Sequence, residues 1–346
     1  MKKICLVCDV PNWAFDIIAK KISEELKNDF EIDIKYFDVR ESSENFFEFL
    51  EEVKSYDMIH FFWRKILLQI ESETFKNKVV KKYGDYDKYI EEISQKISTG
   101  VYDFLFLKDE EIDTFKNVFN KYSKSYYVIS KKLFDKYSNI QAYKPAYGIV
   151  HDVCNTSKMT PKNLERFDEY NRPLVVGWVG NSVIKYDGVD LKGFHSLIKP
   201  VIQELIEEGY NITEHYADRN LKWRTPEEMP DYYNEIDVCL CTSIMEGTPL
   251  PILEAMSCGI PIISTDVGVV PEALGEKQSS YIIGDREYGK NDEKIRKILK
   301  QKLIEVYENR KVLKELSKEN LESIQKYDGG KIVLEYKKYF EKFLED

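Results

Sequence analysis

Long apolar runs are absent from this sequence: none approaches the roughly 20 residues that a membrane-spanning helix needs. The basic start at Lys2 and Lys3 precedes an apolar stretch that already stops at Asp9, which is too short for the core of a secretory signal peptide. We therefore expect residues 4–8 to form a buried strand and the chain to be a soluble, cytoplasmic protein.

Cysteine is scarce, with six residues in a chain of 346. Cys5 and Cys8, like Cys239 and Cys241, lie inside apolar runs, where a free cysteine is typically a small buried side chain. The short spacings within these pairs therefore indicate strand residues, not a zinc site or a redox motif. This usage is typical of a protein in a reducing compartment.

Positive charge is not in excess: 51 Lys and Arg face 61 Asp and Glu, which gives a formal net charge of −10. An acidic chain lacks the broad basic surface of a nucleic-acid binder, so we expect no nucleic acid among its partners. A G-x-G-x-x-G turn, which dehydrogenases use to bind a dinucleotide, follows neither 4–8 nor 174–180. A dehydrogenase is therefore disfavoured.

What the sequence does contain is length for about two domains and short apolar runs that alternate with charged amphipathic stretches. This alternation is typical of α/β proteins with parallel sheets. We predict two Rossmann-like, doubly wound domains that face each other across a cleft, with ligands at the carboxyl ends of the strands. The expected parts are a first domain at 1–150, a polar linker at 151–172, a second domain at 173–328, and a helix at 329–346 that could pack back on the first domain.

The apolar patterns also place individual elements along the chain. Strands are expected at 4–8, 30–37, 58–63, 104–107, 126–129, 174–180, 211–216, 238–242, 261–264 and 281–283. Helices are expected at 14–26, 64–98, 131–137, 193–208, 227–235, 250–258, 291–308, 310–325 and 330–344.

The most informative segment is 246–261, which directly follows the strand expected at 238–242. A loop with Gly247 leads into a short helix that stops at Gly259, and Pro251 suits the first helical turn. A loop of this kind presents free backbone N–H groups and the positive end of a helix. It therefore predicts an anion site, with phosphate as the natural occupant.

Two acidic residues flank this predicted anion site. Glu246 begins the loop, and Glu254 lies about one turn inside the helix. A carboxylate at the second position can accept two hydrogen bonds from vicinal hydroxyls, such as those of a ribose. The alternative is that both acids merely stabilise the N-terminus of the helix, as Glu commonly does.

The spacing from Glu246 to Glu254 resembles the E-x7-E signature of the family-4 retaining glycosyltransferases, which have the GT-B fold of two Rossmann-like domains. The resemblance covers essentially all of the second domain. It extends to residues 232–237, Asp266-Val267-Gly268, Pro271-Glu272, Gly177-Trp178-Val179-Gly180 and Lys192-Gly193.

The resemblance implies a nucleotide-sugar donor, with UDP favoured over GDP, bound mainly by the second domain without a metal or a further cofactor. It assigns the ribose hydroxyls to Glu254 and places Glu246 beside the donor sugar. The backbone of four loop residues would contact the sugar and the diphosphate: Gly247, Thr248, Pro249 and Leu250.

A basic pair usually neutralises the diphosphate in this family, and the resemblance assigns one member of the pair to Lys192. The other position, directly after Gly180, holds Asn181 where the family has Arg. Lys185 in the same loop could replace that Arg, or it could be a solvated loop residue.

The first domain resembles the family less closely. Its opening turn after residue 8 contains no glycine, and we expect this turn to shape the acceptor side through Asp9, Asn12 and Trp13, together with Arg64. Trp13 could instead only pack at the start of a helix. His60 resembles the last residue of the family's Asp-x-x-His segment and is predicted to be catalytic with Glu246 and Lys192, although a strand histidine is often a core residue.

The function implied is retaining transfer of a sugar from the nucleotide to an acceptor hydroxyl on a glycan, glycolipid or protein. A nucleotide-sugar epimerase of the same fold and a non-catalytic nucleotide-sugar binder remain alternatives. The lysine-rich stretches 78–88 and 124–136 could touch anionic lipid at the inner face of the membrane, or they could be solvated helix faces. The oligomeric state is left open.

Overall fold

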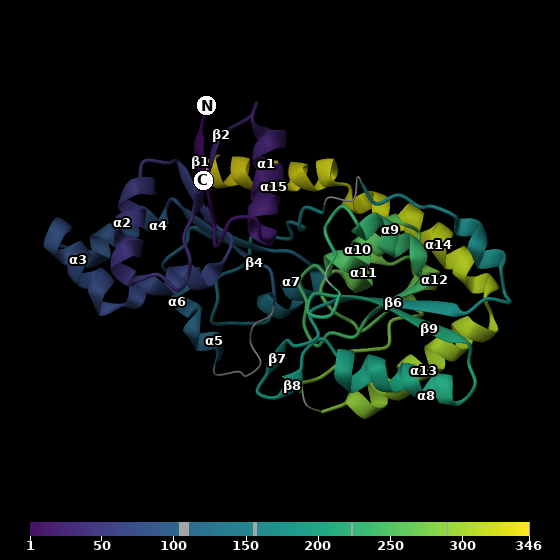
Figure 1. Cartoon of the computed structure of the whole chain (residues 1–346). Helices are drawn as coiled ribbons and strands as arrows, with labels where there is room; N and C mark the ends of the chain where they lie inside the picture. Colours follow the sequence, from purple (N-terminus) through teal and green to yellow (C-terminus); the bar gives the residue numbers. More distant parts are fainter. Residues whose placement is uncertain (104–110, 155–157, 223, 289, 346) are drawn as a thin grey trace. The chain divides into compact units, whose positions relative to one another are not determined.

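The computed structural model describes residues 1–103, 111–154, 158–222, 224–288 and 290–345 (Figure 1). The chain forms two units. Unit 1 comprises Met1–Val153 together with Gly329–Asp346, and unit 2 comprises Cys154–Asp328. Within the described ranges, no helix combines the length and apolar character required to span a bilayer.

Unit 1 is built on a five-stranded parallel sheet with the strand order β2-β1-β3-β4-β5. Its strands are β1 (Lys3–Cys8), β2 (Glu31–Tyr36), β3 (Met58–Phe61), β4 (Ile97–Val101) and β5 (Ser125–Val128). Its helices are α1 (Ala14–Leu26), α2 (Ser43–Val53), η1 (Arg64–Glu71), α3 (Glu73–Tyr83), α4 (Tyr86–Ser94), α5 (Glu111–Thr114), α6 (Lys116–Asn120), α7 (Lys131–Ser138) and α15 (Gly329–Glu345).

Local sequence explains where several of these elements lie. β1 is almost continuously apolar and buried, as expected for a central parallel strand covered on both faces. The Ser42 hydroxyl accepts a hydrogen bond from the Asn45 N–H and starts α2, and Ser72 caps α3 through the Phe75 N–H in the same way. Gly84, with φ of 78°, ends α3 in the left-handed conformation that glycine adopts without strain.

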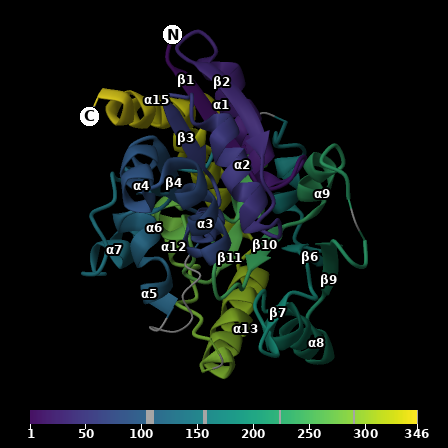
Figure 2. The same cartoon turned by 90° about the vertical axis from the view of Figure 1, so that its left-hand side faces the viewer.

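The C-terminal helix α15 belongs to unit 1 and lies against α1 (Figure 2). Its side chains Tyr336, Tyr339 and Phe340 are wholly buried, and the hydroxyls of Tyr339 and Ser98 on β4 are 2.6 Å apart. The last helix of the chain therefore supplies part of the aromatic core of the first unit.

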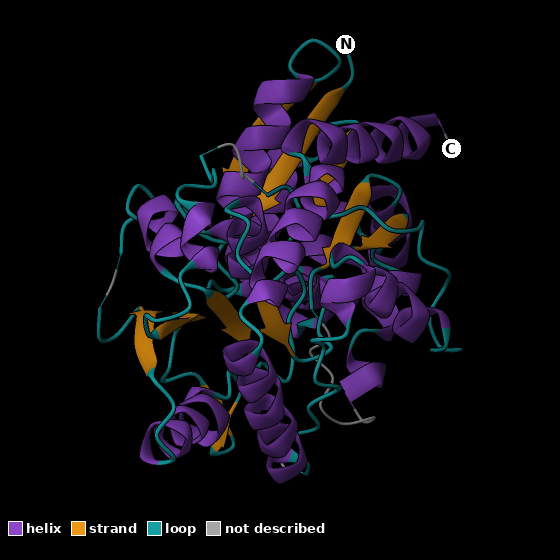
Figure 3. Cartoon of the chain, turned by 90° about the vertical axis from the view of Figure 1, so that its right-hand side faces the viewer, coloured by secondary structure: helices purple, strands orange, loops and turns teal. Residues whose placement is uncertain are grey.

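Unit 2 is built on a four-stranded parallel sheet with the strand order β11-β10-β6-β9, and helices flank its strands (Figure 3). Its strands are β6 (Leu174–Gly180), β9 (Ile212–Asp218), β10 (Val238–Cys241) and β11 (Ile262–Ser264), with a hairpin of β7 (Lys185–Tyr186) and β8 (Val189–Asp190). Its helices are η2 (Leu164–Asp168), η3 (Phe194–Ile198), α8 (Lys199–Glu207), α9 (Met229–Glu235), α10 (Leu250–Ser257), α11 (Val270–Ala273), α12 (Glu276–Ser279), α13 (Asp292–Glu308), α14 (Lys311–Ser323) and η4 (Ile324–Tyr327).

A glycine in β6 lets α9 pack closely on the sheet. A Cβ atom added at Gly177 would lie 2.4 Å from Ile236 Cδ1 and 3.0 Å from the Tyr232 hydroxyl. Tyr232 anchors the helix because its hydroxyl donates to the backbone oxygens of Trp178 on β6 and His215 on β9. The position of α9 is therefore fixed by the sheet.

Several expected elements need correction. The helix expected at 64–98 gives way to β4 at Ile97, and the strand expected at 104–107 lies outside the described residues. The sequence did not predict β4 because the strand contains polar residues. Ser98 and Thr99 are buried and hydrogen-bonded, and the Thr99 hydroxyl donates to the backbone oxygen of Phe61 at 2.7 Å. The strand expected at 281–283 is only an isolated bridge between Ile282 and Ser264. Helix α2 was not expected.

Candidate functional site

The parallel strands of unit 2 bring the ends of β6 and β10 to the same edge of the sheet, with Gly180 ending β6. Segment 242–250 follows β10 and leads into α10, and the turn after β8 carries Lys192. The predicted donor-binding residues therefore gather at the carboxyl edge of the sheet in unit 2, where open α/β sheets bind their ligands.

Lys192 and Glu246 form a close ion pair, with Lys192 Nζ 2.5 Å from Glu246 Oε1. The Ser243 hydroxyl donates to the same oxygen at 2.7 Å, and about a fifth of each charged side chain is exposed, 24% for Lys192 and 19% for Glu246. Burial alone would lower the pKa of the Lys192 ammonium, but the Glu246 carboxylate outweighs it and raises this pKa. Lys192 is therefore a cation throughout the neutral range.

The loop that carries Lys192 is fixed by contacts with the end of β10. The Thr242 hydroxyl donates to the Lys192 oxygen at 2.8 Å. Gly193 has φ of 71°, and a Cβ there would lie 2.6 Å from Thr242 Oγ1 and 2.7 Å from the Thr242 oxygen. Only glycine allows this approach, which holds Lys192 beside the segment that carries Glu246.

Arg286 is a buried residue that sequence reasoning missed. Its guanidinium donates to the backbone oxygens of Asp190 at 2.8 Å and Thr242 at 3.1 Å, and to the Ser196 hydroxyl oxygen at 3.0 Å. Asp292 holds the other side of the guanidinium through two bonds of 2.7 Å. Arg286 therefore ties the Lys192 loop to the end of β10. No local motif marks it in the sequence, because its partners Asp190, Ser196 and Thr242 come from distant segments.

Glu254 projects from α10 and is partly buried. Its Oε2 accepts a hydrogen bond of 2.6 Å from the Tyr233 hydroxyl on α9. Burial raises the pKa of the Glu254 carboxyl, and the Tyr233 hydroxyl opposes that shift by bonding to the ionised form. Tyr233 is wholly buried and is a second residue that sequence reasoning did not select as part of the site.

The loop at 246–250 differs in one respect from the predicted anion site. The Leu250 N–H donates to the Thr248 oxygen and the Ile252 N–H to the Pro249 oxygen, both at 2.8 Å, while Pro251 has no N–H. The start of α10 therefore offers an anion fewer free backbone donors than predicted. The Thr248 hydroxyl is buried without a hydrogen-bond partner, so it is available to a ligand instead.

A close backbone approach holds this loop in place. Gly268 has φ of 50°, and a Cβ at this position would lie only 1.8 Å from the Gly247 oxygen. The Val269 N–H donates to that same oxygen at 3.1 Å. Gly268 therefore lets two loops pack backbone to backbone beside Glu246.

The residues directly after β6 are engaged in local structure. Gly180 ends the strand, and the next residue, Asn181, is tied into the turn by its side chain. The Asn181 side-chain oxygen accepts from the Asn220 amide at 2.5 Å and from the Val183 N–H at 3.2 Å. Asn181 therefore shapes this turn, and whether it also contacts a donor stays a prediction.

Lys185 is exposed on the hairpin, and its backbone lies opposite Asp190 in the antiparallel register of β7 and β8. Both residues line a pocket of about 560 Å³, together with His195 and Lys290. Lys192 does not line this pocket. The substitution of Lys185 for the family's usual Arg therefore stays a prediction.

The opening turn of unit 1 is held by a buried acid. Asn12 has φ of 62°, and its N–H donates to Asp16 Oδ2 at 2.6 Å, while Asp16 Oδ1 accepts from the Tyr36 hydroxyl at 2.8 Å. Trp13 directly precedes α1 and is 56% exposed, and the Asp9 carboxylate accepts from the Val10 N–H. Whether Trp13 contacts an acceptor or only packs at the start of the helix stays open.

His60, which was predicted to be catalytic, is wholly buried on β3, and its catalytic role stays a prediction. Its Nδ1 lies 2.9 Å from Ser98 Oγ and its Nε2 lies 3.1 Å from the Tyr127 hydroxyl, with the His60 and Tyr127 rings stacked. Burial lowers the pKa of His60 to about 3, so the ring is neutral at physiological pH. The structure favours the alternative of a core histidine.

Arg64, predicted on the acceptor side, is also buried, with 1% of its surface exposed. Its guanidinium contacts Asp103 through bonds of 3.2 and 3.3 Å and lies over the Phe115 ring. The burial of Arg64 and its contacts with Asp103 therefore favour a structural role over direct contact with an acceptor.

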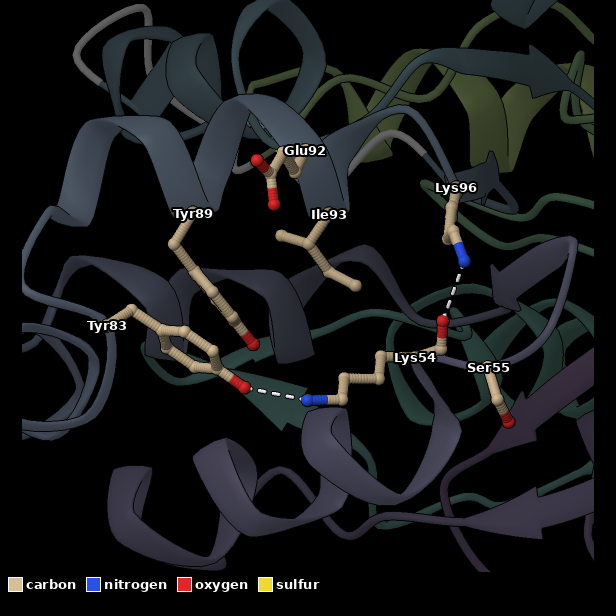
Figure 4. A pocket seen from close by; sticks show the side chains of 7 residues that line it. All are labelled: Lys54, Ser55, Tyr83, Tyr89, Glu92, Ile93 and Lys96. Atoms are coloured by element: carbon tan, nitrogen blue, oxygen red, sulfur yellow. Dashed lines mark hydrogen bonds between the residues drawn. The ribbon is translucent and has the colours of Figure 1, made fainter.

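A second pocket, of about 410 Å³, lies among α2, α3 and α4 in unit 1 (Figure 4). Lys54 Nζ contacts the Tyr83 hydroxyl at 2.7 Å, and Lys96 Nζ donates to the Lys54 oxygen at 2.7 Å. Lys96 also immediately precedes β4, so the pocket is at the amino end of that strand. Its lysines stabilise the end of α2. The pocket therefore lies away from the carboxyl edge of the sheet, where the acceptor residues are predicted.

The lysine-rich stretches considered for lipid contact form internal contacts. Lys78 pairs with Glu44 at 2.5 Å, and Lys82 pairs with Glu51 at 2.6 Å. In the second stretch, Lys124 donates to the Phe343 oxygen at 2.8 Å. Contact of these stretches with anionic lipid stays a prediction. Among the described residues, no group of three or more His, Cys, Asp or Glu side chains is arranged to hold a metal ion.

One segment of unit 2 is similar to a known protein family. Residues 217–320 match the model of the family described as glycosyl transferases group 1. The chain is 35% identical over 86 residues to O-antigen chain mannosyltransferase B of Escherichia coli, a match that covers 25% of this chain and 22% of the relative. The chain spans about a fifth of the length of the first curated relatives it matches.

Solved structures resemble the chain over nearly its whole length. Anabaena Alr3699/HepE in complex with UDP has a TM-score of 0.66 at 14% identity, covering 99% of this chain and 100% of that protein. Sucrose-phosphate synthase from Thermosynechococcus elongatus has a TM-score of 0.66 at 13% identity, with 99% of both chains covered. The predicted GT-B fold, with two α/β units built on parallel sheets, is therefore confirmed.

Proposed function

We propose that the chain is a family-4 retaining glycosyltransferase that moves a sugar from a nucleotide-sugar donor to an acceptor hydroxyl. The observation that carries the proposal is the grouping of Lys192, Glu246 and Glu254 on the loops and helix that follow the strands of unit 2. The family match at 217–320 includes both glutamates, and the solved structure of Alr3699/HepE contains UDP.

In the proposed complex, Glu254 accepts hydrogen bonds from the ribose hydroxyls, and Lys192 faces the diphosphate. An ammonium has three N–H donors, and its bond to Glu246 uses one of them. The unpartnered Thr248 hydroxyl is placed on the same loop as Glu246 and can bond to the sugar or the diphosphate. We favour UDP over GDP as the nucleotide and propose that no metal is required.

Transfer breaks the bond between the anomeric carbon and the phosphate oxygen and forms a bond from that carbon to the acceptor oxygen. The acceptor proton passes to the departing phosphate. Lys192 stabilises the negative charge that develops on this leaving group, as a preorganised cation does in a site with restricted water. The acceptor is proposed to be a glycan, a glycolipid or a protein.

A thermal-shift panel of UDP-sugars and GDP-sugars tests the proposal. A ligand present at 100 times its dissociation constant stabilises the folded state by about 2.7 kcal/mol. The wild type should be stabilised by at least one nucleotide sugar, and Glu254→Gln should lose most of that shift. Glu315→Gln, which removes a remote carboxylate paired with Lys277 on the surface, is the matched control.

Product analysis then separates the alternatives. A transferase releases the nucleoside diphosphate and joins the sugar to an acceptor with the anomeric configuration retained. An altered sugar without transfer would instead indicate an epimerase, and binding without turnover across the acceptor panel would indicate a non-catalytic binder. The absence of stabilisation by every nucleotide sugar would contradict the proposal.

A further inference from the structure

Tyr233 and Glu254 connect two helices of unit 2 that lie side by side, α9 and α10 (Figure 1). The Tyr233 hydroxyl donates to Glu254 Oε2 at 2.6 Å, and the Tyr233 ring is wholly buried against Tyr232. A carboxylate has two oxygens, so this bond engages Oε2 and leaves Oε1 for another donor. The geometry thus limits how Glu254 can turn.

We infer that Tyr233 is a positioning residue for nucleotide binding: its hydroxyl fixes the Glu254 carboxylate in the orientation and charge state that accept the ribose hydroxyls. This inference rests on the proposed function, because it assigns Tyr233 a role through Glu254. It adds a residue on a different helix from the E-x7-E segment, and it predicts a dependence on pH that a merely structural tyrosine would not produce.

No cation among the groups around Glu254 that are considered below stabilises its ionised carboxylate; a hydroxyl does so instead. Three titratable groups lie close enough to Glu254 for its carboxylate to raise their pKa: the Tyr233 hydroxyl on α9, the Cys239 thiol on β10 and the Cys258 thiol after α10. Of these, Tyr233 is the one whose hydrogen bond acts on the Glu254 carboxyl. Burial raises the pKa of each of these groups, so all three are neutral at pH 7. A hydrogen bond from a neutral hydroxyl therefore stabilises the Glu254 carboxylate.

The sign of the effect follows from the charge states. Burial raises the pKa of Glu254, and loss of the Tyr233 hydroxyl would raise it further. The carboxyl would then take up a proton at a higher pH than in the wild type. A protonated carboxyl has less capacity to accept bonds from two ribose hydroxyls. As the pH is lowered, nucleotide affinity should therefore begin to fall at a higher pH without the Tyr233 hydroxyl than it does in the wild type.

Calorimetric titration with UDP between pH 8 and pH 5.5 tests this inference. Tyr233→Phe keeps the ring and removes the hydroxyl, and it should bind UDP about tenfold to a hundredfold more weakly at pH 7. Its affinity should also begin to fall at a higher pH than that of the wild type.

The matched control is Tyr232→Phe on the same helix. Tyr232 is equally buried, but its hydroxyl donates to the Trp178 and His215 oxygens instead of Glu254. This variant should retain the wild-type pH profile even if it is less stable. A shift of its profile equal to that of Tyr233→Phe would overturn the inference.

Glu254→Gln separates failure of the inference from failure of the proposed function. This variant should bind UDP weakly, and adding Tyr233→Phe to it should cause no further loss. If Glu254→Gln binds as tightly as the wild type, the proposed ribose contact is wrong. If it binds weakly while Tyr233→Phe retains both wild-type affinity and pH profile, only the role of Tyr233 is wrong.

A second variant keeps the test decisive if Tyr233→Phe does not fold. Glu254→Asp retains the charge but moves the carboxylate back by one methylene, away from the Tyr233 hydroxyl. It should show weaker UDP binding and an earlier loss of affinity on acidification. Wild-type affinity with a wild-type pH profile in Glu254→Asp would contradict the inference.

Discussion

The carboxyl edges of the two sheets differ, although both units are built from parallel strands and helices. In unit 2, charged side chains at this edge remain partly exposed, as Lys192 and Glu246 show. In unit 1, His60 and Arg64 are buried among aromatic side chains. A shared strand arrangement therefore does not give two chemically similar edges, because the residues that follow and cover the strands decide what each edge can bind.

The largest effect on turnover is expected when the cation of unit 2 is removed. Lys192→Met should reduce transfer about a hundredfold to a thousandfold, because the leaving diphosphate loses its preorganised positive charge. Release of the nucleoside diphosphate measures this loss. Lys199→Met, which breaks a surface ion pair with Glu214, is the control. An equal loss of turnover in both variants would contradict a specific role of Lys192 in transfer.

A smaller loss is expected from Arg286→Lys. Lysine offers three donors in place of the five of arginine, so it cannot keep the bonds to Asp190, Thr242 and Asp292 together. The Lys192 loop should loosen, and turnover should fall about tenfold. Steady-state kinetics measures the change, and wild-type turnover would show that the buried Arg286 does not position the site.

In unit 1, His60→Gln should leave turnover within about threefold of the wild type, since this residue lies in the core and glutamine retains hydrogen-bonding groups. The expected difference is in stability against pH. The pKa of His60 is about 3 in the folded chain, below its ordinary value of 6.5. On acidification the unfolded chain therefore binds this proton first, and stability is lost as the pH falls below about 6.5.

Urea unfolding at pH 7 and pH 5 measures this contribution. The neutral form of His60 should account for about 2 kcal/mol of the wild-type stability lost between these values, and His60→Gln should lack that part. Equal pH dependence in the two proteins would contradict the buried, neutral assignment. A large loss of turnover with normal stability would return His60 to the catalytic residues.

The smallest effect is expected at the hairpin of unit 2. Lys185 is exposed on β7, so Lys185→Ala should change UDP affinity less than about threefold. Calorimetry measures the difference. A loss of UDP affinity comparable to that of Lys192→Met in the same calorimetric titration would show that Lys185 replaces the missing Arg at position 181.

The sequence predicted the α/β architecture and the segment around Glu246 and Glu254 because both depend on local patterns. A run of apolar residues marks a central strand, and the loop–helix segment has a recognisable spacing. The burial of His60 could not be read locally, since its hydrogen-bond partner Ser98 also contacts Tyr339, which lies 241 residues further along the chain. Arg286 was missed for the same physical reason: distant segments create its environment.

Hydrogen exchange with and without UDP tests most directly the central claim that unit 2 supplies the principal donor-binding contacts. We expect slower amide exchange in 246–257 when UDP is bound, little change in 58–67, and loss of the protection in Glu254→Gln at the same UDP concentration. Protection confined to 58–67, with unchanged exchange in 246–257, would contradict it.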